Sequence, residues 1–151
     1  MSGNKRHCSY RMKTAYTLLM QRCGLSIREA AALHDVGLDT VKSWSSGRNP
    51  VPAGTIKELR HLYTRIEAAA AECMIAIAAS PVQPDIVELG LTVDDDNARH
   101  LGWPCVGAQE AMLGLVIARM GQFVRVVPRG NTAATSEAAA RHEQRLIRPA
   151  D

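Results

Sequence analysis

The residue types that carry out chemistry are present in this 151-residue chain, but their spacing assembles no catalytic or metal site. The five histidines share no metal-ligand spacing, and the four cysteines include no C-x-x-C pair. The run 94-DDDN-97 is typical of a helix start, where acidic side chains favour the positive end of the helix dipole. We therefore expect no enzyme activity, no metal and no cofactor, and thiols that stay reduced.

Basic side chains are concentrated in the first half of the chain, where they could bind a polyanion. Residues 1–65 hold 11 Lys and Arg against 4 Asp and Glu, whereas residues 66–151 hold 7 against 11. Ordinary surface charge is the alternative, but the uneven split favours a surface that faces nucleic acid. No run of 18 apolar residues occurs, so we expect no membrane span and a cytoplasmic, nucleoid-associated protein.

Three predicted helices in this basic half would position its polar side chains. The first is expected at about 11–22 and is ended by Gly24. The second, 26-SIREAAALH-34, opens with the S-x-x-E pattern of a capping box. A short turn leads to the third, at about 38–46, which Gly47 ends. The side chains expected to face inward include Leu18 and Leu19 in the first helix, Ala31 in the second, and Val41 and Trp44 in the third. This order predicts a helix-turn-helix.

The stretch 25-LSIREAAALHDVGLDTVKSWSSGRNPVP-52 resembles the Cro/phage-repressor (XRE) helix-turn-helix family, which has the lambda-repressor-like fold. The positions that match the family pattern without a gap are Leu25, Ser26, Ala31, Val41, Trp44, Gly47, Arg48 and Pro50. The resemblance covers about residues 10–66 and implies a transcriptional regulator of bacterial or phage origin. It further implies a dimeric repressor that reads a pseudo-palindromic operator in double-stranded DNA through the major groove.

Three positions depart from the family pattern. Asp35 stands in the turn where the family usually has Gly, Ile27 where Gln is frequent, and Ser45 where Glu is frequent. Because Asp adopts the left-handed conformation more readily than most residues, we expect the turn to survive. Ile27 removes a familiar contact to a base or a phosphate. The run 49-NPVPAG-54 before a long helix is similar to prophage-type autorepressors.

The resemblance and the helix positions together imply which side chains would contact DNA. The base-reading set at the start of the third helix is Leu38, Asp39, Thr40, Lys42 and Ser43. The phosphate-binding set is Ser26, Arg28, Ser45, Arg48 and Asn49. Nonspecific affinity would come from Lys5, Arg6 and Arg11 of an N-terminal arm. Two alternatives stay open, because Asp39 could only stabilise its helix start and Thr40 could be an ordinary surface residue.

A long helix is predicted from about 53 to 79, with an unbroken heptad pattern of apolar residues. The second half of this stripe outruns a compact three-helix bundle and needs a partner. The partner would be either the C-terminal segment of the same chain or a second subunit. The side chains of this dimer or core stripe are Ile66, Ala70, Cys73 and Ile77.

The remaining sequence predicts a strand, two helices and another strand within residues 80–130, a small α/β unit for dimerisation or partner binding. Residues 1–9 would form a flexible basic arm and residues 10–79 the DNA-binding domain, and residues 131–151 a frayed helix or disordered tail. The expected fold class is mainly α (α+β), a lambda-repressor-like bundle with this added unit. The alternative function is an antitoxin-like or adaptor module that binds a protein partner through residues 80–130, with secondary DNA or RNA binding.

Overall fold

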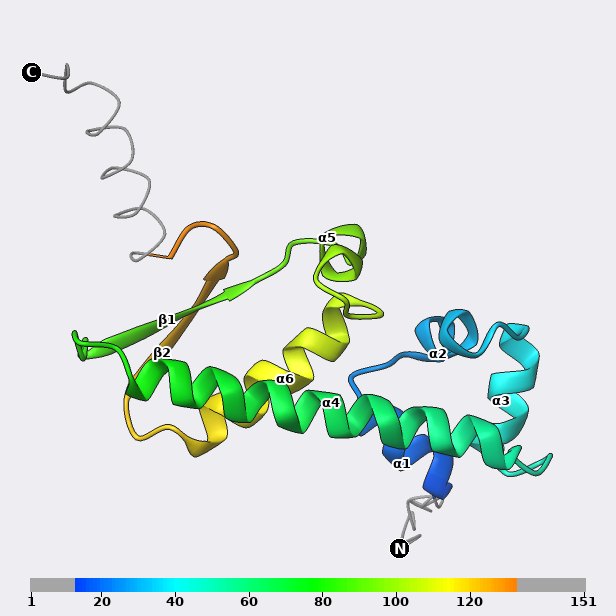
Figure 1. Cartoon of the computed structure of the whole chain (residues 1–151). Coiled ribbons are helices and arrows are strands. Elements are labelled where there is room, and N and C mark those ends of the chain that lie inside the picture. Colours follow the sequence, from blue (N-terminus) through cyan, green and yellow to red (C-terminus); the bar gives the residue numbers. More distant parts are fainter. Residues whose placement is uncertain (1–12, 133–151) are drawn as a thin grey trace, which may run out of the picture.

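The computed structural model describes residues 13–132. The elements in chain order are α1 (Ala15–Arg22), α2 (Ile27–His34), α3 (Leu38–Ser46), α4 (Ala53–Ala78), β1 (Ile86–Leu91), α5 (Asp95–His100), α6 (Val106–Arg119) and β2 (Phe123–Pro128). Helix α4 runs along the molecule, with α1, α2 and α3 at its N-terminal end and the α/β elements along its other half (Figure 1). The protein is therefore mainly helical with a small parallel sheet. This agrees with the predicted class, mainly α (α+β).

The ends of the first three helices are set by residues in the left-handed conformation. Asp35 has φ 51° and ψ 50°, and the amide that follows it donates to the Ala31 carbonyl at 3.0 Å. Gly47 has φ 73°, and the Arg48 amide donates to the Ser43 carbonyl at 3.0 Å. Both ends satisfy helix carbonyls that would otherwise lack a donor. The prediction that Asp35 substitutes for glycine in the turn is confirmed.

The first core lies where α1, α2 and α3 meet α4. Ala31, Val41 and Trp44 are all buried, as predicted, and Val41 is fully enclosed. The predicted inward face of α1 is wrong at Leu18, which is 52% exposed, whereas Leu19 packs against this core. Tyr16 and Met20, which were not predicted to face inward, are buried. Thr14 caps α1, and the helix phase that follows turns Tyr16, Met20 and Cys23 inward at i, i+4 and i+7.

The second half of α4 is covered by the same chain. Ile66 and Ala70 are fully buried, and Cys73 and Ile77 are half-buried. Ala70, Cys73 and Ile77 pack in a second core with Val87 and Leu89 of β1 and with α6. Two partners were predicted for the apolar stripe of α4. In the structure, the C-terminal segment of the same chain covers it.

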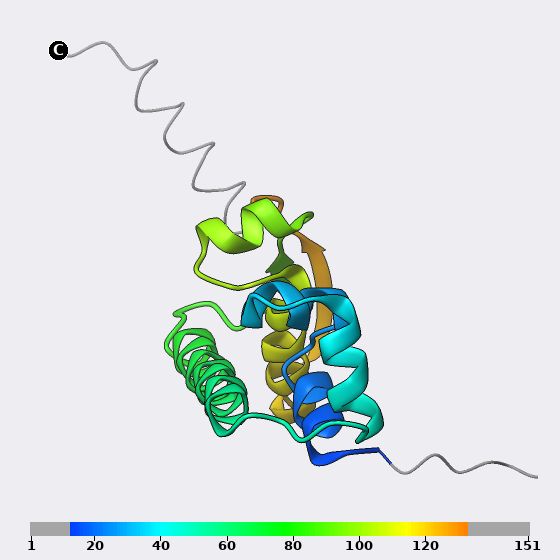
Figure 2. The same ribbon diagram turned by 90° about the vertical axis from the view of Figure 1, so that its right-hand side faces the viewer.

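The C-terminal segment has the predicted order of strand, two helices and strand. Strands β1 and β2 are parallel, with Ile86 in register with Phe123 and Leu91 with Pro128. In Figure 2, β1 lies nearer α4 and β2 lies on the far side of the sheet. The edge of β1 away from β2 therefore faces α4.

The C-terminal segment also contributes to the first core, together with the N-terminal helices. Ala98, Trp103, Cys105 and Ala108 belong to the same buried cluster as Tyr16 and Trp44. The backbones of Gly24, after α1, and of Gly107, in the first turn of α6, pass close to each other. None of the helices within residues 13–132 is long and apolar enough to cross a membrane. The predicted N-terminal arm and most of the predicted tail lie outside the described residues.

Candidate nucleic-acid interface

Helix α3 lies on the opposite side of the bundle from α4 (Figure 2) and presents part of the predicted base-reading set. Leu38, Asp39 and Lys42 are exposed, and Thr40 is half-buried. The prediction for Ser43 is wrong, because its side chain is only 4% exposed and lies in the interior of the bundle. Helix phase alone does not put position 43 on the face of Val41, because two residues turn an α-helix by about 200°. The packing of α3 against the rest of the bundle covers this side chain.

The two charged residues of the exposed face interact with each other. The Lys42 ammonium lies 3.4 Å from an Asp39 carboxylate oxygen, one helical turn away. Both side chains are largely in solvent, with exposed fractions of 56% and 99%. An exposed pair of this kind contributes at most about 1 kcal/mol, so a DNA contact can open it at little cost.

A cluster of three rings fixes the orientation of α3. Trp44 is 7% exposed and meets Tyr16 edge-on, with ring centroids 5.7 Å apart, and His34 at 6.0 Å. His34 Nδ1 donates to Glu58 Oε2 at 2.6 Å, which ties this cluster to α4. Burial raises the pKa of the Tyr16 hydroxyl to about 12, and the Glu58 carboxylate adds to the rise. The hydroxyl of Tyr16 therefore stays protonated at neutral pH.

The C-terminal end of α3 is held by α1. The Thr17 hydroxyl donates to the Ser45 carbonyl at 3.1 Å, and the Thr14 hydroxyl lies 3.4 Å from the same oxygen. The prediction that Ser45 binds a phosphate is wrong, since its hydroxyl oxygen is buried and has no hydrogen-bond partner among the described residues. The contact between α1 and α3 covers this hydroxyl, and a phosphate cannot reach it.

Arg48 and Asn49 follow the end of α3 and are exposed. The Schellman-type end at Gly47 fixes the backbone from which both side chains project, because the amides of Arg48 and Asn49 donate to the Ser43 carbonyl at 3.0 and 3.4 Å. The structure thus places a cation at the rim of α3, as the sequence predicted.

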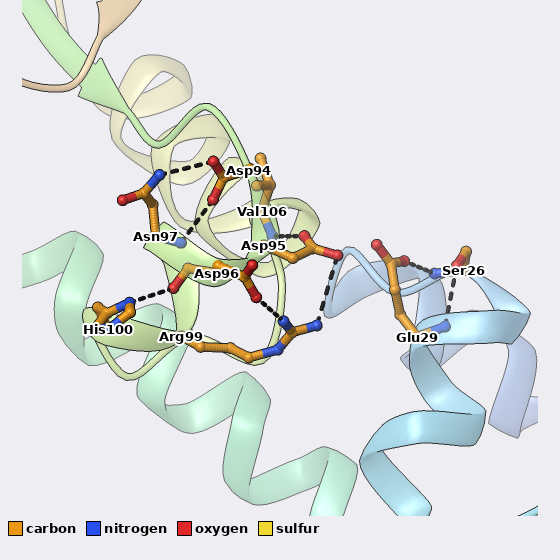
Figure 3. A network of polar contacts seen from close by, with 9 residues as sticks. All are labelled: Ser26, Glu29, Asp94, Asp95, Asp96, Asn97, Arg99, His100 and Val106. Atoms are coloured by element: carbon orange, nitrogen blue, oxygen red, sulfur yellow. Dashed lines mark hydrogen bonds and ion pairs between the residues drawn. The ribbon is translucent and has the colours of Figure 1, made fainter.

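The start of α2, the other predicted phosphate site, has acidic neighbours. The Ser26 amide donates to the Glu29 carboxylate at 2.6 Å and the Glu29 amide donates to the Ser26 hydroxyl, so the predicted capping box is formed. Figure 3 shows the Asp95 side chain of α5 pointing toward this helix start. Burial raises the pKa of the Cys105 thiol to about 11, and smaller rises come from Glu29 and then Asp95. These carboxylates oppose the binding of a phosphate at Ser26. The Arg28 side chain, two residues further along α2, is exposed.

Ser46 is a surface residue of α3 that the sequence reasoning missed. It lies at i+7 from Asp39 and i+4 from Lys42, and so on the same exposed face. Its hydroxyl donates to the Ser43 carbonyl at 3.0 Å and can still accept one hydrogen bond from outside. The helical period from Asp39 and Lys42 was the signal that could have found it.

No protein-family model matches the chain, and no curated protein matches it. The candidate interface is therefore defined by the exposed residues of α3 and by the buried contacts that fix this helix.

Outside α3, residues 13–132 hold other titratable side chains, among them Asp94 and Cys23. No group of three or more His, Cys, Asp and Glu is placed to hold a metal ion in this part of the chain. Asp94 caps α5 by accepting from the Asn97 amide at 2.7 Å, as Figure 3 shows. Burial raises the pKa of the Cys23 thiol to about 11, so this thiol is un-ionised at neutral pH.

Proposed function

We propose that the chain is a sequence-specific DNA-binding transcriptional regulator, acting as a dimeric repressor that inserts α3 into the major groove. One observation carries the proposal: the buried Val41 and Trp44 hold α3 rigidly, while Asp39 and Lys42 project from its outer face. Readout of base edges requires a short helix whose inner face is packed against the bundle and whose outer face carries polar side chains.

Each exposed side chain of α3 has a partner in the groove that suits its chemistry. The Asp39 carboxylate accepts from a cytosine amino group, and Leu38 packs against a thymine methyl. Lys42 donates to guanine or to a phosphate once its pair with Asp39 opens. Arg48 and Asn49 bind the backbone beside the groove, and Arg28 adds a phosphate contact from α2.

One copy of α3 covers too few bases for a specific site, so the proposal includes a homodimer on half-sites about 34 Å apart. Ile66 and Ala70 are fully buried within one chain and are not available to a second one. The α/β elements instead carry exposed apolar side chains along β2, with Phe123 82% and Val126 46% exposed. We assign the dimer contact to this edge of the sheet, where a second β2 would continue the hydrogen-bonded ladder.

The DNA proposal predicts that Lys42→Ala and Arg48→Ala each weaken binding to the operator. Gel shifts against the DNA upstream of the chain's own gene should show a loss of about 5- to 100-fold for Lys42→Ala if Lys42 reads a base. Arg48→Ala should weaken binding to all duplexes and lower the salt slope by about one.

Arg119→Ala is the matched control, since it removes the same charge from the exposed far end of α6. Circular dichroism should show that all three variants keep the fold. Equal affinity of the wild-type chain for its upstream DNA and for random duplexes would contradict the proposal. Preferential binding to RNA of the same sequence would indicate an RNA-binding function instead.

The dimer is tested by sedimentation of the full chain and of Phe123→Glu. We expect the wild-type chain to sediment at twice its mass of 16.4 kDa and Phe123→Glu at the single mass, because a buried unpaired charge opposes association. Ile75→Glu, at a position 69% exposed on α4, should stay dimeric. A wild-type chain that sediments at 16.4 kDa at micromolar concentration would refute the dimer.

A further inference from the structure

Two adjoining cavities follow β1 from its unpaired edge to its carboxyl end. One has a volume of about 710 Å³ and the other about 630 Å³. Both are bordered by Gly90, Leu101, Arg129 and Thr132, so they lie next to each other at the end of β1. Each volume lies in the range of about 300–1,000 Å³ that small-molecule sites occupy.

The larger cavity is mainly apolar. It lies between the edge of β1 that faces α4 and the helices α4 and α6. These three elements and the segments that connect them supply its walls. The side chains that give it this character are Ile77, Val82, Leu89, Trp103, Met112 and Leu113. An apolar molecule placed here would be removed from water on several sides, which favours binding roughly in proportion to the area buried.

The smaller cavity has a mixed lining that includes polar side chains and one cationic side chain. It lies at the carboxyl ends of the two parallel strands, which is where open α/β sheets bind their ligands. Asn97, His100 and Arg129 line it. Within residues 13–132 no carboxylate forms an ion pair with Arg129, whereas Arg125 on the same strand pairs with Glu88 at 3.5 Å. An arginine that lines a cavity is complementary to an anionic ligand.

The backbone fixes Arg129 at this place. Its amide donates to the Leu91 carbonyl at 2.7 Å, at the end of β1. Gly90 makes the close passage possible, because a Cβ atom there would lie 3.2 Å from the Arg129 Cα. His100 donates its Nδ1 hydrogen to the Asp96 carbonyl at 2.7 Å, so its Nε2 remains for a second partner.

We propose that these two neighbouring cavities together bind a small molecule with an apolar body and one carboxylate group. The body lies between β1 and α4 against Ile77 and Met112, and the carboxylate meets Arg129. The site is independent of the proposed DNA binding, and its test uses no DNA.

Calorimetric titration of the full chain with decanoate, decan-1-ol and acetate separates the two halves of the ligand. Decanoate should bind, decan-1-ol should bind about tenfold or more weakly because it lacks the charge, and acetate should not bind measurably. Arg129→Gln should lower decanoate affinity to that of decan-1-ol and leave decan-1-ol unchanged. Ala76→Glu, at an exposed position of α4 on the rim of the larger cavity, should weaken both.

Arg119→Gln is the control for charge, since Arg119 lies on α6 away from both cavities. A second readout is alkylation of Cys73, which lines the larger cavity: decanoate should slow its reaction with N-ethylmaleimide, followed by peptide mass spectrometry. Equal affinity for decanoate and decan-1-ol, or an Arg129→Gln variant that binds decanoate like the wild type, would overturn the proposal. So would a folded chain that binds none of the three molecules.

Discussion

Replacing Gly107 by alanine is expected to destabilise the folded chain by about 2–3 kcal/mol, close to the upper end for overpacking in a core. A Cβ atom at Gly107 would lie 2.1 Å from the Gly24 carbonyl oxygen, well inside van der Waals contact. The contact is with backbone rather than with a flexible side chain, so relief requires α6 to move away from the end of α1. Since α6 carries most of the contacts of the α/β elements with α4, the loss is expected to affect the whole molecule.

The measurement is urea unfolding of Gly107→Ala, followed by tryptophan fluorescence. The chain has two Trp, Trp44 on the inner face of α3 and Trp103 just before α6. One experiment therefore reports on the N-terminal helices and on the C-terminal segment. Gly114→Ala is the matched control on the same helix, because a Cβ there has no atom within 4 Å. It should be stabilised by about 0.5–1 kcal/mol through the lower entropy of its unfolded chain. If the two variants unfold at the same urea concentration, the close contact between Gly24 and Gly107 does not hold the molecule together.

The ends and the order of the elements could be predicted from the sequence because they depend on local chemistry. Ser26 with Glu29 caps α2, Asp94 caps α5, and Gly47 ends α3, each through bonds to residues at most four positions away. Such bonds form in the same way whatever lies beyond them. The strand, helix, helix and strand of the C-terminal segment followed from the same kind of signal.

The packing of the elements on one another could not be predicted in the same way. Leu18 and Tyr16 are both plausible inward residues of α1, and only contact with His34 and Trp44 decides for Tyr16. Ser43 and Ser45 are small and polar, so their composition favours the surface, yet their positions between helices bury their hydroxyl oxygens. The cavity beside β1 is built by α4, β1, α6 and connecting segments that are far apart in sequence, and no short pattern indicates it.

Trp44→Ala is expected to cost about 3–5 kcal/mol of the free energy of unfolding, the largest effect of any single change considered for this chain. The indole is 7% exposed and meets the rings of Tyr16 and His34, so its removal leaves a cavity among three helices. A small domain is stable by only about 5–15 kcal/mol, and the variant is therefore expected to be partly unfolded at 37 °C. Calorimetric melting and urea unfolding followed by circular dichroism measure the loss.

Trp44→Phe separates the packing role of this residue from the readout of DNA. A phenyl ring keeps an edge-on contact with Tyr16 and fills part of the space, so we expect a loss of about 1–2 kcal/mol and a folded chain. Because α3 then keeps its support, operator binding by Trp44→Phe should stay within a few-fold of the wild type, whereas folded Lys42→Ala should not. A folded Trp44→Phe variant that loses operator binding as completely as Lys42→Ala would mean that the exact pose of α3, and not only its exposed side chains, determines recognition. Unchanged melting of Trp44→Ala would contradict the buried ring cluster as the support of α3.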